Sequence, residues 1–363
     1  MSDLFDYITW RGDLSFEQSP FGNVDALIIS RLSYLPLDGI VSADFHSSIT
    51  LKSAADRFLA APSEVRMEQD IPLIRRMAES RRYGEMLLCG YINQHDDTEQ
   101  KQFAALCCET HSNMIVSFRG TDGTLVGWKE DFNMAFSAPV PAQRSAAEYL
   151  LALIKSSGKP IITVGHSKGG NLAVYSAANV GQKHEKRIAA VYNNDGPGFD
   201  RALLSTGGFS RVSEKTKTFV PQSSVIGMLL EHEEAYTVVR SVNSGLMQHD
   251  LYSWELSGPE LVTLSSVTTS SRVIDETLRD WLASMSYEQR EMLTDALFTV
   301  LGSTGAETLR EMSGSLYKTA GAIFNSARGL DTETVKALQQ IVKLLAKSVG
   351  RNISEEVREL VTT

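Results

Sequence analysis

The sequence predicts an α/β protein in which helices cover a mainly parallel central sheet. First, short β-like runs alternate with longer helical runs between about residues 86 and 241, as in successive strand–helix–strand units. Second, a glycine-rich turn, Gly165 to Gly169, separates an apolar β-like run from an Ala-rich helical run. Third, only helical periodicity follows about residue 270. We therefore expect a sheet-containing domain over residues 1–270 and a helical C-terminal region over residues 271–363.

Composition and charge exclude several classes of protein. The chain has 363 residues, of which 42% are hydrophobic and 22% charged, as in ordinary folded domains. Its net charge of −9, with both signs mixed, argues against a nucleic-acid partner, which would need a basic face. No apolar run approaches the roughly 18 residues of a membrane span, and the acidic N-terminus lacks a secretory core. We expect a cytoplasmic protein whose three cysteines, Cys89, Cys107 and Cys108, are reduced and pack in the core.

The residues before the sheet are predicted to be mainly helical, because their apolar residues recur every three or four positions. Asn23 could cap the first of these helices, and Pro36 stops it. A strand is expected near Tyr7 to Trp10. The helices predicted in this part of the chain are Asn23–Leu35, Leu51–Ala60 and Ile71–Arg81.

The pattern then changes to β-like runs. Turn signals at Asp96-Asp97 and at residues 111–113 separate the first three, which predicts an antiparallel meander that joins the central sheet. Helices are expected near Trp128–Asn133, over Ala142–Lys155 and from Gly169 onward. The predicted strands are Met86–Ile92, Gln102–Cys108, Met114–Phe118, Ile161–Val164, Arg187–Asn193, Thr216–Val220 and Ala235–Ser241.

Ser167 stands at the apex of the glycine-rich turn, in the pattern G-x-S-x-G. This is the nucleophile elbow of an α/β-hydrolase, where glycines two residues either side let the strand and the helix pass closely. The alternative is a glycine-rich turn that only serves packing. A serine hydroxyl also needs a base and an acid that orients the base, and in this fold they follow in the order Ser, Asp or Glu, His.

Three histidines follow Ser167, and His249 is the leading candidate for the base. It lies in a loop after the last sheet-like run, where the base of such an enzyme is expected. The alternative is an ordinary loop histidine. His184 lies in a polar turn close after the elbow helix, and His232 stands among Glu231, Glu233 and Glu234 on what we predict to be an exposed acidic face.

Asp195 is the leading candidate for the acid. It directly follows a predicted strand, 28 residues after the serine, and precedes Gly196-Pro197-Gly198. A carboxylate at the carboxyl end of a strand lies at the functional edge of such a sheet. The alternative is a turn aspartate. Asp250, which adjoins His249, and Asp200 are weaker candidates.

The oxyanion hole needs two backbone donors. The residue after the nucleophile, Lys168, supplies one amide, and an earlier strand-to-helix loop supplies the other. The stretch Arg119-Gly120-Thr121 has that position, so the Thr121 amide is our candidate. Arg119 could be catalytic, but we favour a structural role in which it braces this loop against a carboxylate such as Asp131.

Two separated motifs, FRGT (Phe118–Thr121) with Trp128 and Asp131 after it, and GHSxGG (Gly165–Gly170), resemble the class 3 lipases over roughly residues 85 to 255. The resemblance implies that Ser167 is the nucleophile and that Thr121 supplies an oxyanion amide. Segments at the N-terminus, including WRGDLSF, together with YNNDGPGF and QHDLYSW, resemble a little-characterised bacterial family of lipase-like α/β-hydrolases.

The sequence departs from the class 3 pattern at two places. Lys168 replaces the usual leucine, which predicts a wetter mouth or an anionic substrate. The stretch FVPQSSVIG carries Ser223 and Ser224 and no aspartate, where that family has its acid. Asp195 with Gly-Pro-Gly-Phe is instead similar to a segment of the pancreatic-type lipases, in which the acid follows the earlier strand.

These residues predict a serine hydrolase that cleaves carboxylic esters through an acyl-enzyme, with no metal or organic cofactor. Its partner would be a small-molecule or lipid ester. Thioesterase, phospholipase and peptidase activities stay open, as does a catalytically idle scaffold that binds partners. The helical region or the segment Val225–Glu234, as a lid, could make peripheral membrane contact, although core packing is the favoured role for the helical region. The sequence leaves the oligomeric state open.

Overall fold

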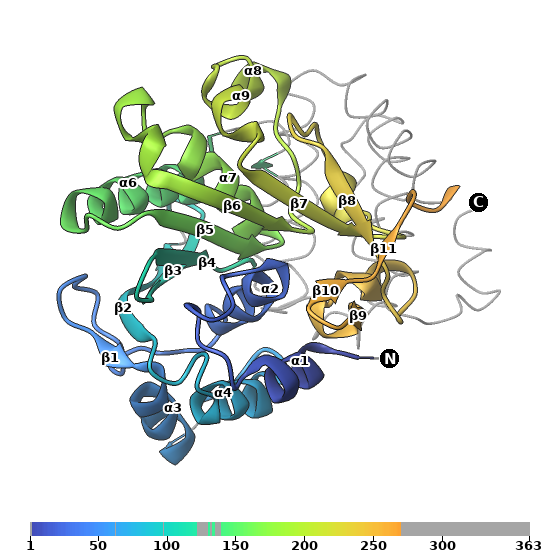
Figure 1. Ribbon diagram of the computed structural model, residues 1–363. Coiled ribbons are helices and arrows are strands. Elements are labelled where there is room, and N and C mark those ends of the chain that lie inside the picture. Colours follow the sequence, from blue (N-terminus) through green and yellow to red (C-terminus); the bar gives the residue numbers. More distant parts are fainter. Residues whose placement is uncertain are drawn as a thin grey trace, which may run out of the picture.

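The computed structural model describes residues 2–269, except Pro62, Asp97, 122–129, 131–132 and 135–138. Figure 1 shows a twisted sheet of nine strands in the order β1-β2-β3-β4-β5-β6-β7-β8-β11, beside a two-stranded sheet formed by β9 and β10. The strands are β1 Ile49–Thr50, β2 Leu87–Asp96, β3 Lys101–Glu109, β4 Met114–Phe118, β5 Ile161–His166, β6 Ile188–Asn194, β7 Thr216–Pro221, β8 Tyr236–Val239, β9 Leu256–Ser257, β10 Glu260–Leu261 and β11 Thr263–Leu264.

The centre of the sheet is parallel, as predicted. Strands β4 to β8 pair in parallel, and β2, β3 and β4 form the expected antiparallel meander. The register pairs Phe118 with Gly165 and His166 with Asn194. The carboxyl ends of β4, β5 and β6 therefore lie at one edge of the sheet. Thr121, Ser167 and Asp195 follow these three strands in turn, so the predicted site residues come from the same edge.

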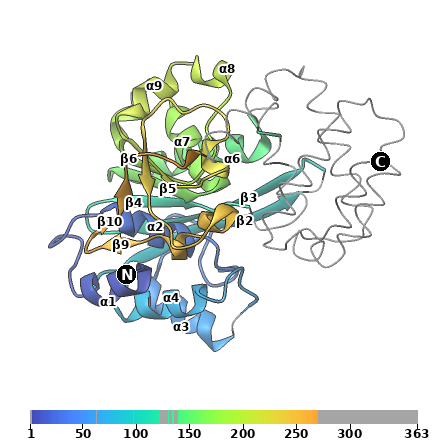
Figure 2. The same ribbon diagram turned by 90° about the vertical axis from the view of Figure 1, so that its right-hand side faces the viewer.

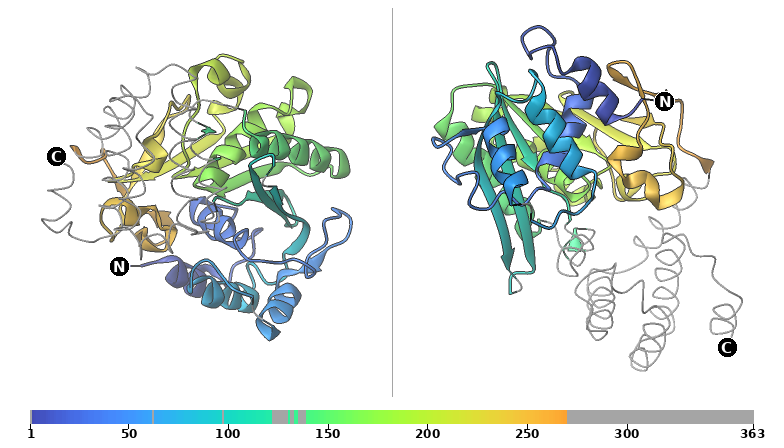
Figure 3. Two further views of the ribbon diagram at one scale, coloured as in Figure 1. Left: turned by 180° about the vertical axis from the view of Figure 1, so that it is seen from behind. Right: turned by 90° about the horizontal axis from the view of Figure 1, so that it is seen from below.

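Helices cover both faces of the sheet. Helices α1 to α4 lie on one face and α6 to α9 on the other, while β2 and β3 extend beyond their neighbours (Figure 2 and Figure 3). The helices are α1 Leu4–Arg11, α2 Asn23–Leu32, α3 Leu51–Ala60, α4 Asp70–Glu79, α6 Pro141–Ser156, α7 Lys168–Ala178, α8 Arg201–Leu204 and α9 Gly208–Ser213. Short 3₁₀ helices are η1 Gln182–Arg187, η2 Ile226–Met228, η3 Gly245–His249 and η4 Leu251–Ser253.

The two larger hydrophobic cores follow from the alternation of side chains along the strands. Ile115 and Val164 belong to the core beneath α1 to α4, whereas residues on the opposite face, such as Val116, belong to the core beneath α6 and α7. Cys89, Cys107 and Cys108 are free thiols buried in these cores, as predicted. The α/β-hydrolase fold class is thus confirmed for the sheet-containing domain.

The strand predicted near Tyr7 to Trp10 is wrong, because these residues belong to helix α1. Asp3 caps that helix and forms a capping box with Asp6, and Leu4, Tyr7 and Ile8 are buried at helical spacing. The cap of α2 is Gly22 rather than Asn23. The helical region over residues 271–363 and most of the helix expected near Trp128 lie outside the described residues.

Gly165 is predicted to tolerate no side chain, because a Cβ there would lie 2.0 Å from the carbonyl oxygen of Gly169. Gly165→Ala should lower the free energy of unfolding by about 3 kcal/mol or more, since backbone atoms must move. Gly158→Ala is the matched control: no described atom lies within 4 Å of its Cβ, and stability should change by about 0.5 kcal/mol or less. Urea unfolding measures both, and equal stabilities of the two variants would contradict the prediction.

Candidate active site

Ser167 sits on a strained turn between β5 and α7. Its backbone has φ 60° and ψ −133°, a conformation that is uncommon for a residue other than glycine. The turn is held by hydrogen bonds from the Ser167 amide to the Asn194 carbonyl (3.0 Å) and from the Gly170 amide to the Ser167 carbonyl (2.8 Å). Ser167 is half-buried, whereas the residues on either side of it are buried. The chain therefore has the geometry that presents a serine at the sheet edge.

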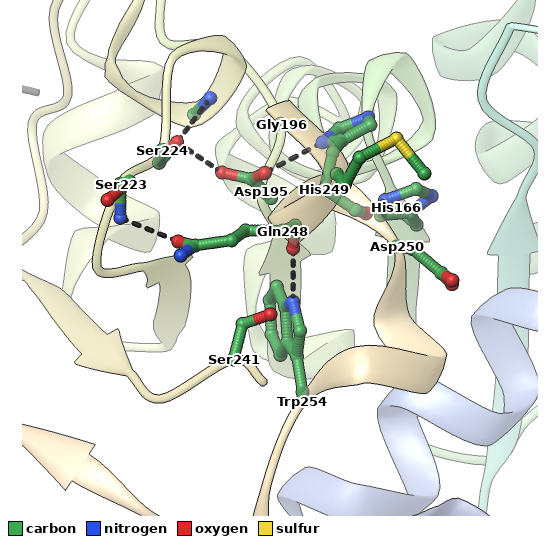
Figure 4. Close-up of polar contacts among 12 residues, drawn as sticks. His166, Asp195, Gly196, Ser223, Ser224, Ser241, Gln248, His249, Asp250 and Trp254 are labelled. Carbon is green, nitrogen blue, oxygen red and sulfur yellow. Dashed lines mark hydrogen bonds and ion pairs between the residues drawn. The ribbon is translucent and has the colours of Figure 1, made fainter. Parts of the chain in front are cut away.

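Asp195 directly follows β6 and is also in a strained conformation, with φ 53°. Its amide donates to the carbonyl of Phe219 at the end of β7 (2.8 Å), and its carboxylate is 1% exposed. Ser224 Oγ donates to Asp195 Oδ1 at 2.5 Å, and Oδ2 lies 2.7 Å from His249 Nδ1 (Figure 4). The carboxylate is therefore fixed on both oxygens and points at the histidine.

His249 ends the 3₁₀ helix η3 and exposes 25% of its side chain. Since Nδ1 lies against the carboxylate of Asp195, the proton on that nitrogen is used in this bond, and Nε2 is left able to accept one. The ring packs against that of His166, with centroids 4.4 Å apart. Among the described residues, no hydrogen bond joins Ser167 Oγ to His249. Such bonds are often long in substrate-free enzymes.

His166 connects the candidate base, His249, to the N-terminal part of the chain. Its Nε2 lies 2.7 Å from the main-chain oxygen of His249, which can only accept, so this nitrogen carries the proton. Its Nδ1 then accepts from the hydroxyl of Tyr34 at 3.0 Å. Burial and the neighbouring His249 ring hold the pKa of His166 well below its ordinary value. The ring is therefore neutral and holds the backbone of the candidate base.

The other candidate bases and acids lie elsewhere. His184 lies half-buried in η1. The prediction that His232 is exposed is wrong: its ring lies 2.8 Å from the Gly227 carbonyl and 3.2 Å from Glu234, with 9% of its side chain exposed. Burial alone would lower the pKa of His232, but the hydrogen bond and charge of Glu234 outweigh burial and raise it. Asp250 and Asp200 accept hydrogen bonds from amides at the starts of η4 and α8.

Residues 77–299, more than half of the chain, match the sequence profile of the Mbeg1-like family. The chain belongs to the Mbeg1-like family. The predicted resemblance to a lipase-like family is thereby confirmed, while the bacterial origin stays a prediction. The match begins within α4, so Tyr34 comes from the part of this Mbeg1-like chain that precedes it. A search of curated protein sequences gives no significant match.

Two solved structures are similar to the fold of this Mbeg1-like protein. The first is a mutant form of MDLA from Penicillium cyclopium, with 12% identity, a TM-score of 0.41 and coverage of 68% of this chain and 87% of that one. The second is M37 lipase, with 13% identity, a TM-score of 0.35 and coverage of 57% and 68%. Likenesses of this degree do not bear on activity, and the fold class rests on the strand order above.

The two candidate oxyanion donors come from segments in contact. A Cβ on Gly120 would lie 3.1 Å from Ser167 Cβ and 2.6 Å from the His166 carbonyl, so the stretch Arg119–Thr121 passes directly beside the elbow. Thr121 and Arg119 are both buried. Asp131, the carboxylate predicted to pair with Arg119, lies outside the described residues.

The side chain of Lys168 does not line the mouth of a pocket. It is 1% exposed, and its ammonium binds Gln102 and Glu130. The expectation that Lys168 is exposed beside the nucleophile is therefore wrong, and its side chain gives no support for a wetter mouth or an anionic substrate. The reason is that a lysine at the first position of α7 can reach back beneath the elbow to a carboxylate far away in the sequence.

Nothing in the sequence indicates a role for Tyr34, Gln102 or Glu130, because each meets the elbow only through the fold. The sequence did indicate a role for Ser224, since Ser223-Ser224 occupies the place where the class 3 pattern has its acid.

Among the residues that the structure describes, no three His, Cys, Asp or Glu side chains form a group that could hold a metal ion. Over the same part of this Mbeg1-like chain, no helix is long and apolar enough to cross a membrane.

The low pKa of His166 predicts that acid destabilises the protein through this residue. Below about pH 6.5 the unfolded chain binds a proton here that the folded protein does not, so stability falls by up to about 1.4 kcal/mol per pH unit. His166→Gln, which keeps a donor and an acceptor, should remove that part of the slope. Urea unfolding at about pH 7.5 and about pH 5 compares the variant with wild type, and identical slopes would contradict the prediction.

Proposed function

We propose that this protein is a serine hydrolase that cleaves carboxylic esters through an acyl-enzyme on Ser167. The observation that carries the proposal is the 2.7 Å contact between Asp195 Oδ2 and His249 Nδ1 at the sheet edge that carries Ser167 on its strained turn. Serine, aspartate and histidine follow each other in the order of α/β-hydrolases. Membership of a lipase-like family is consistent with an ester substrate.

In the proposed reaction, Ser167 Oγ attacks the ester carbonyl while His249 Nε2 takes its proton. Asp195 holds the imidazolium through Nδ1, and the Lys168 and Thr121 amides bind the oxyanion. Collapse of the tetrahedral intermediate breaks the ester bond, and His249 passes the proton to the leaving alcohol. Water then attacks the acyl-enzyme by the same route, which releases the acid and restores Ser167. The chemistry needs no metal or organic cofactor.

The nature of the leaving group is not fixed by this geometry, so thioesters and phospholipids are alternative substrates. The segment 225–234, considered above as a lid, is tied to the chain after Asp195. Gly198 donates to the Leu229 carbonyl at 2.8 Å, and Phe199 and Glu231 exchange hydrogen bonds of 2.7 and 3.1 Å. Gly227 packs directly against Asp195, where a Cβ would lie 2.3 Å from Oδ1. These contacts favour a role in supporting the acid rather than in covering the site.

Ser167 is expected to react with a fluorophosphonate probe, since such probes label activated serines. Ser167→Ala should abolish labelling and the hydrolysis of p-nitrophenyl esters at unchanged thermal stability. An acyl-chain series of these esters, measured on wild type, would then define the preferred chain length. A wild-type protein that is neither labelled nor active would instead support the catalytically idle scaffold.

Asp195→Asn should lower kcat by roughly 10⁴-fold, because an amide favours the wrong tautomer of His249. Ser224→Ala removes the hydrogen bond to the Asp195 carboxylate and the acceptor of the Gly227 amide, and leaves the carboxylate itself in place. A hydrogen bond to a charged group contributes about 1.5–3 kcal/mol, so kcat should fall by roughly 100-fold at most. Steady-state kinetics on the two variants gives the order, and a larger effect for Ser224→Ala would overturn the assignment of Asp195 as the acid.

A further inference from the structure

The side chain of Lys168 is a buried charge beside the nucleophile that the proposed ester cleavage does not use. Its Nζ lies 2.9 Å from the main-chain oxygen of Gln102, 2.8 Å from Gln102 Oε1 and 2.9 Å from Glu130 Oε2. An ammonium group has three hydrogen-bond donors, and each of these three oxygens can accept one of them. A buried charge costs several kcal/mol unless it is paired in this way, so the arrangement is strongly fixed.

Glu130 is held at both of its oxygens. Besides Lys168, Oε2 accepts from the main-chain amide of Gln102 at 3.1 Å, and Oε1 accepts from the Ala142 amide in the first turn of α6 at 2.9 Å. A carboxylate is favoured at the N-terminus of a helix. The carboxylate is completely buried. One ion pair thus joins the start of α7, strand β3 and the start of α6.

The strand that the cluster holds also binds the segment of the second candidate oxyanion donor. The pairing of β3 with β4 matches Ala105 to Phe118, and Arg119 N donates to the Ala104 carbonyl at 3.0 Å. The strand pairing ends at Ala105 and Phe118, and the bond from Arg119 holds the chain that leads on to Thr121 against β3. Lys168 offers its own amide at the elbow, while its side chain binds Gln102, which lies in the same strand as Ala104. Gly120 lies so close to Ser167 and His166 that a side chain at Gly120 would not fit between its own segment and the elbow.

We propose that the buried ion pair of Lys168 and Glu130, together with Gln102, sets the separation of the Lys168 and Thr121 amides and so positions the oxyanion hole. This inference rests on the proposed ester hydrolysis. The three side chains are positioning residues, because they are buried and the charged groups of Lys168 and Glu130 bind each other and Gln102 rather than a substrate. Oxyanion donors act only at about 2.7–3.1 Å from the developing charge, and the loss of one lowers kcat by roughly 10²–10³-fold.

The test uses the full chain and two variants, Glu130→Gln and the double variant Lys168→Met with Glu130→Gln. The first keeps the shape and an acceptor for Ala142, and the second leaves no unpaired buried charge. Both should lower kcat for p-nitrophenyl butyrate by at least roughly 10-fold, with KM nearly unchanged. The Ki of a trifluoromethyl ketone, whose adduct with Ser167 places an oxyanion at the same amides, should rise in proportion to the loss of kcat/KM.

Asp25→Asn is the matched control, because Asp25 forms another buried ion pair, with Arg82 at 2.6 Å, on helix α2. It should lower the melting temperature and leave kcat and the ketone Ki unchanged. Wild-type kcat and Ki in the Glu130 variants would overturn the inference and show a purely structural pair. If the double variant does not fold, Glu130→Gln alone decides. A wild-type protein that neither hydrolyses the ester nor reacts with a fluorophosphonate would overturn the proposed function, and this inference with it.

Discussion

The close approach of strand β5 to the start of helix α7 is the constraint on which the rest of the site depends. A side chain at Gly165 would overlap the Gly169 carbonyl, and one at Gly169 would lie 2.1 Å from the Phe118 carbonyl. This packing forces Ser167 to a positive φ and keeps it half-exposed among buried neighbours. It also brings the end of β4 against the elbow. Two backbone contacts, Gly165 with Gly169 and Gly169 with Phe118, therefore bring the candidate nucleophile beside the loop with a candidate oxyanion amide.

The candidate acid, Asp195, is held by contacts of its own. Asp195 takes a positive φ and is held by the Phe219 carbonyl, by Ser224 and by the segment around Gly227. The carboxylate thus comes from the end of β6, while the chain after β7, where the class 3 pattern has its acid, supplies a hydroxyl to support it. Ser167 and Asp195 follow adjacent strands, and both have a strained backbone conformation with a positive φ. Such conformations cost free energy and are found mostly at functional sites.

Two buried hydrogen-bond networks hold the elbow in place. Tyr34 and His166 hold the main chain of His249, whereas Lys168, Gln102 and Glu130 form a second network beneath the elbow. Each network joins the elbow to a different part of the fold, the first to the segment after α2 and the second to β3 and α6. Because breaking a buried hydrogen bond leaves polar groups without water to replace the partner, both networks are expected to be rigid.

Local signals in the sequence predicted helices α2, α3, α4, α6 and α7, the antiparallel meander, the parallel centre and the order of Ser167, Asp195 and His249, since periodicity and turn chemistry act over a few residues. The short helices α8 and α9 were not predicted. The local signals failed at Tyr7–Trp10, where the capping box of α1 outweighed a β-like composition. Only the tertiary structure decided which carboxylate meets His249, and that Lys168 and His232 are buried. The physical reason is that burial depends on partners far along the chain: Glu130 and Gln102 are 38 and 66 residues from Lys168. The residues next to Lys168 in the sequence do not indicate that such a partner exists.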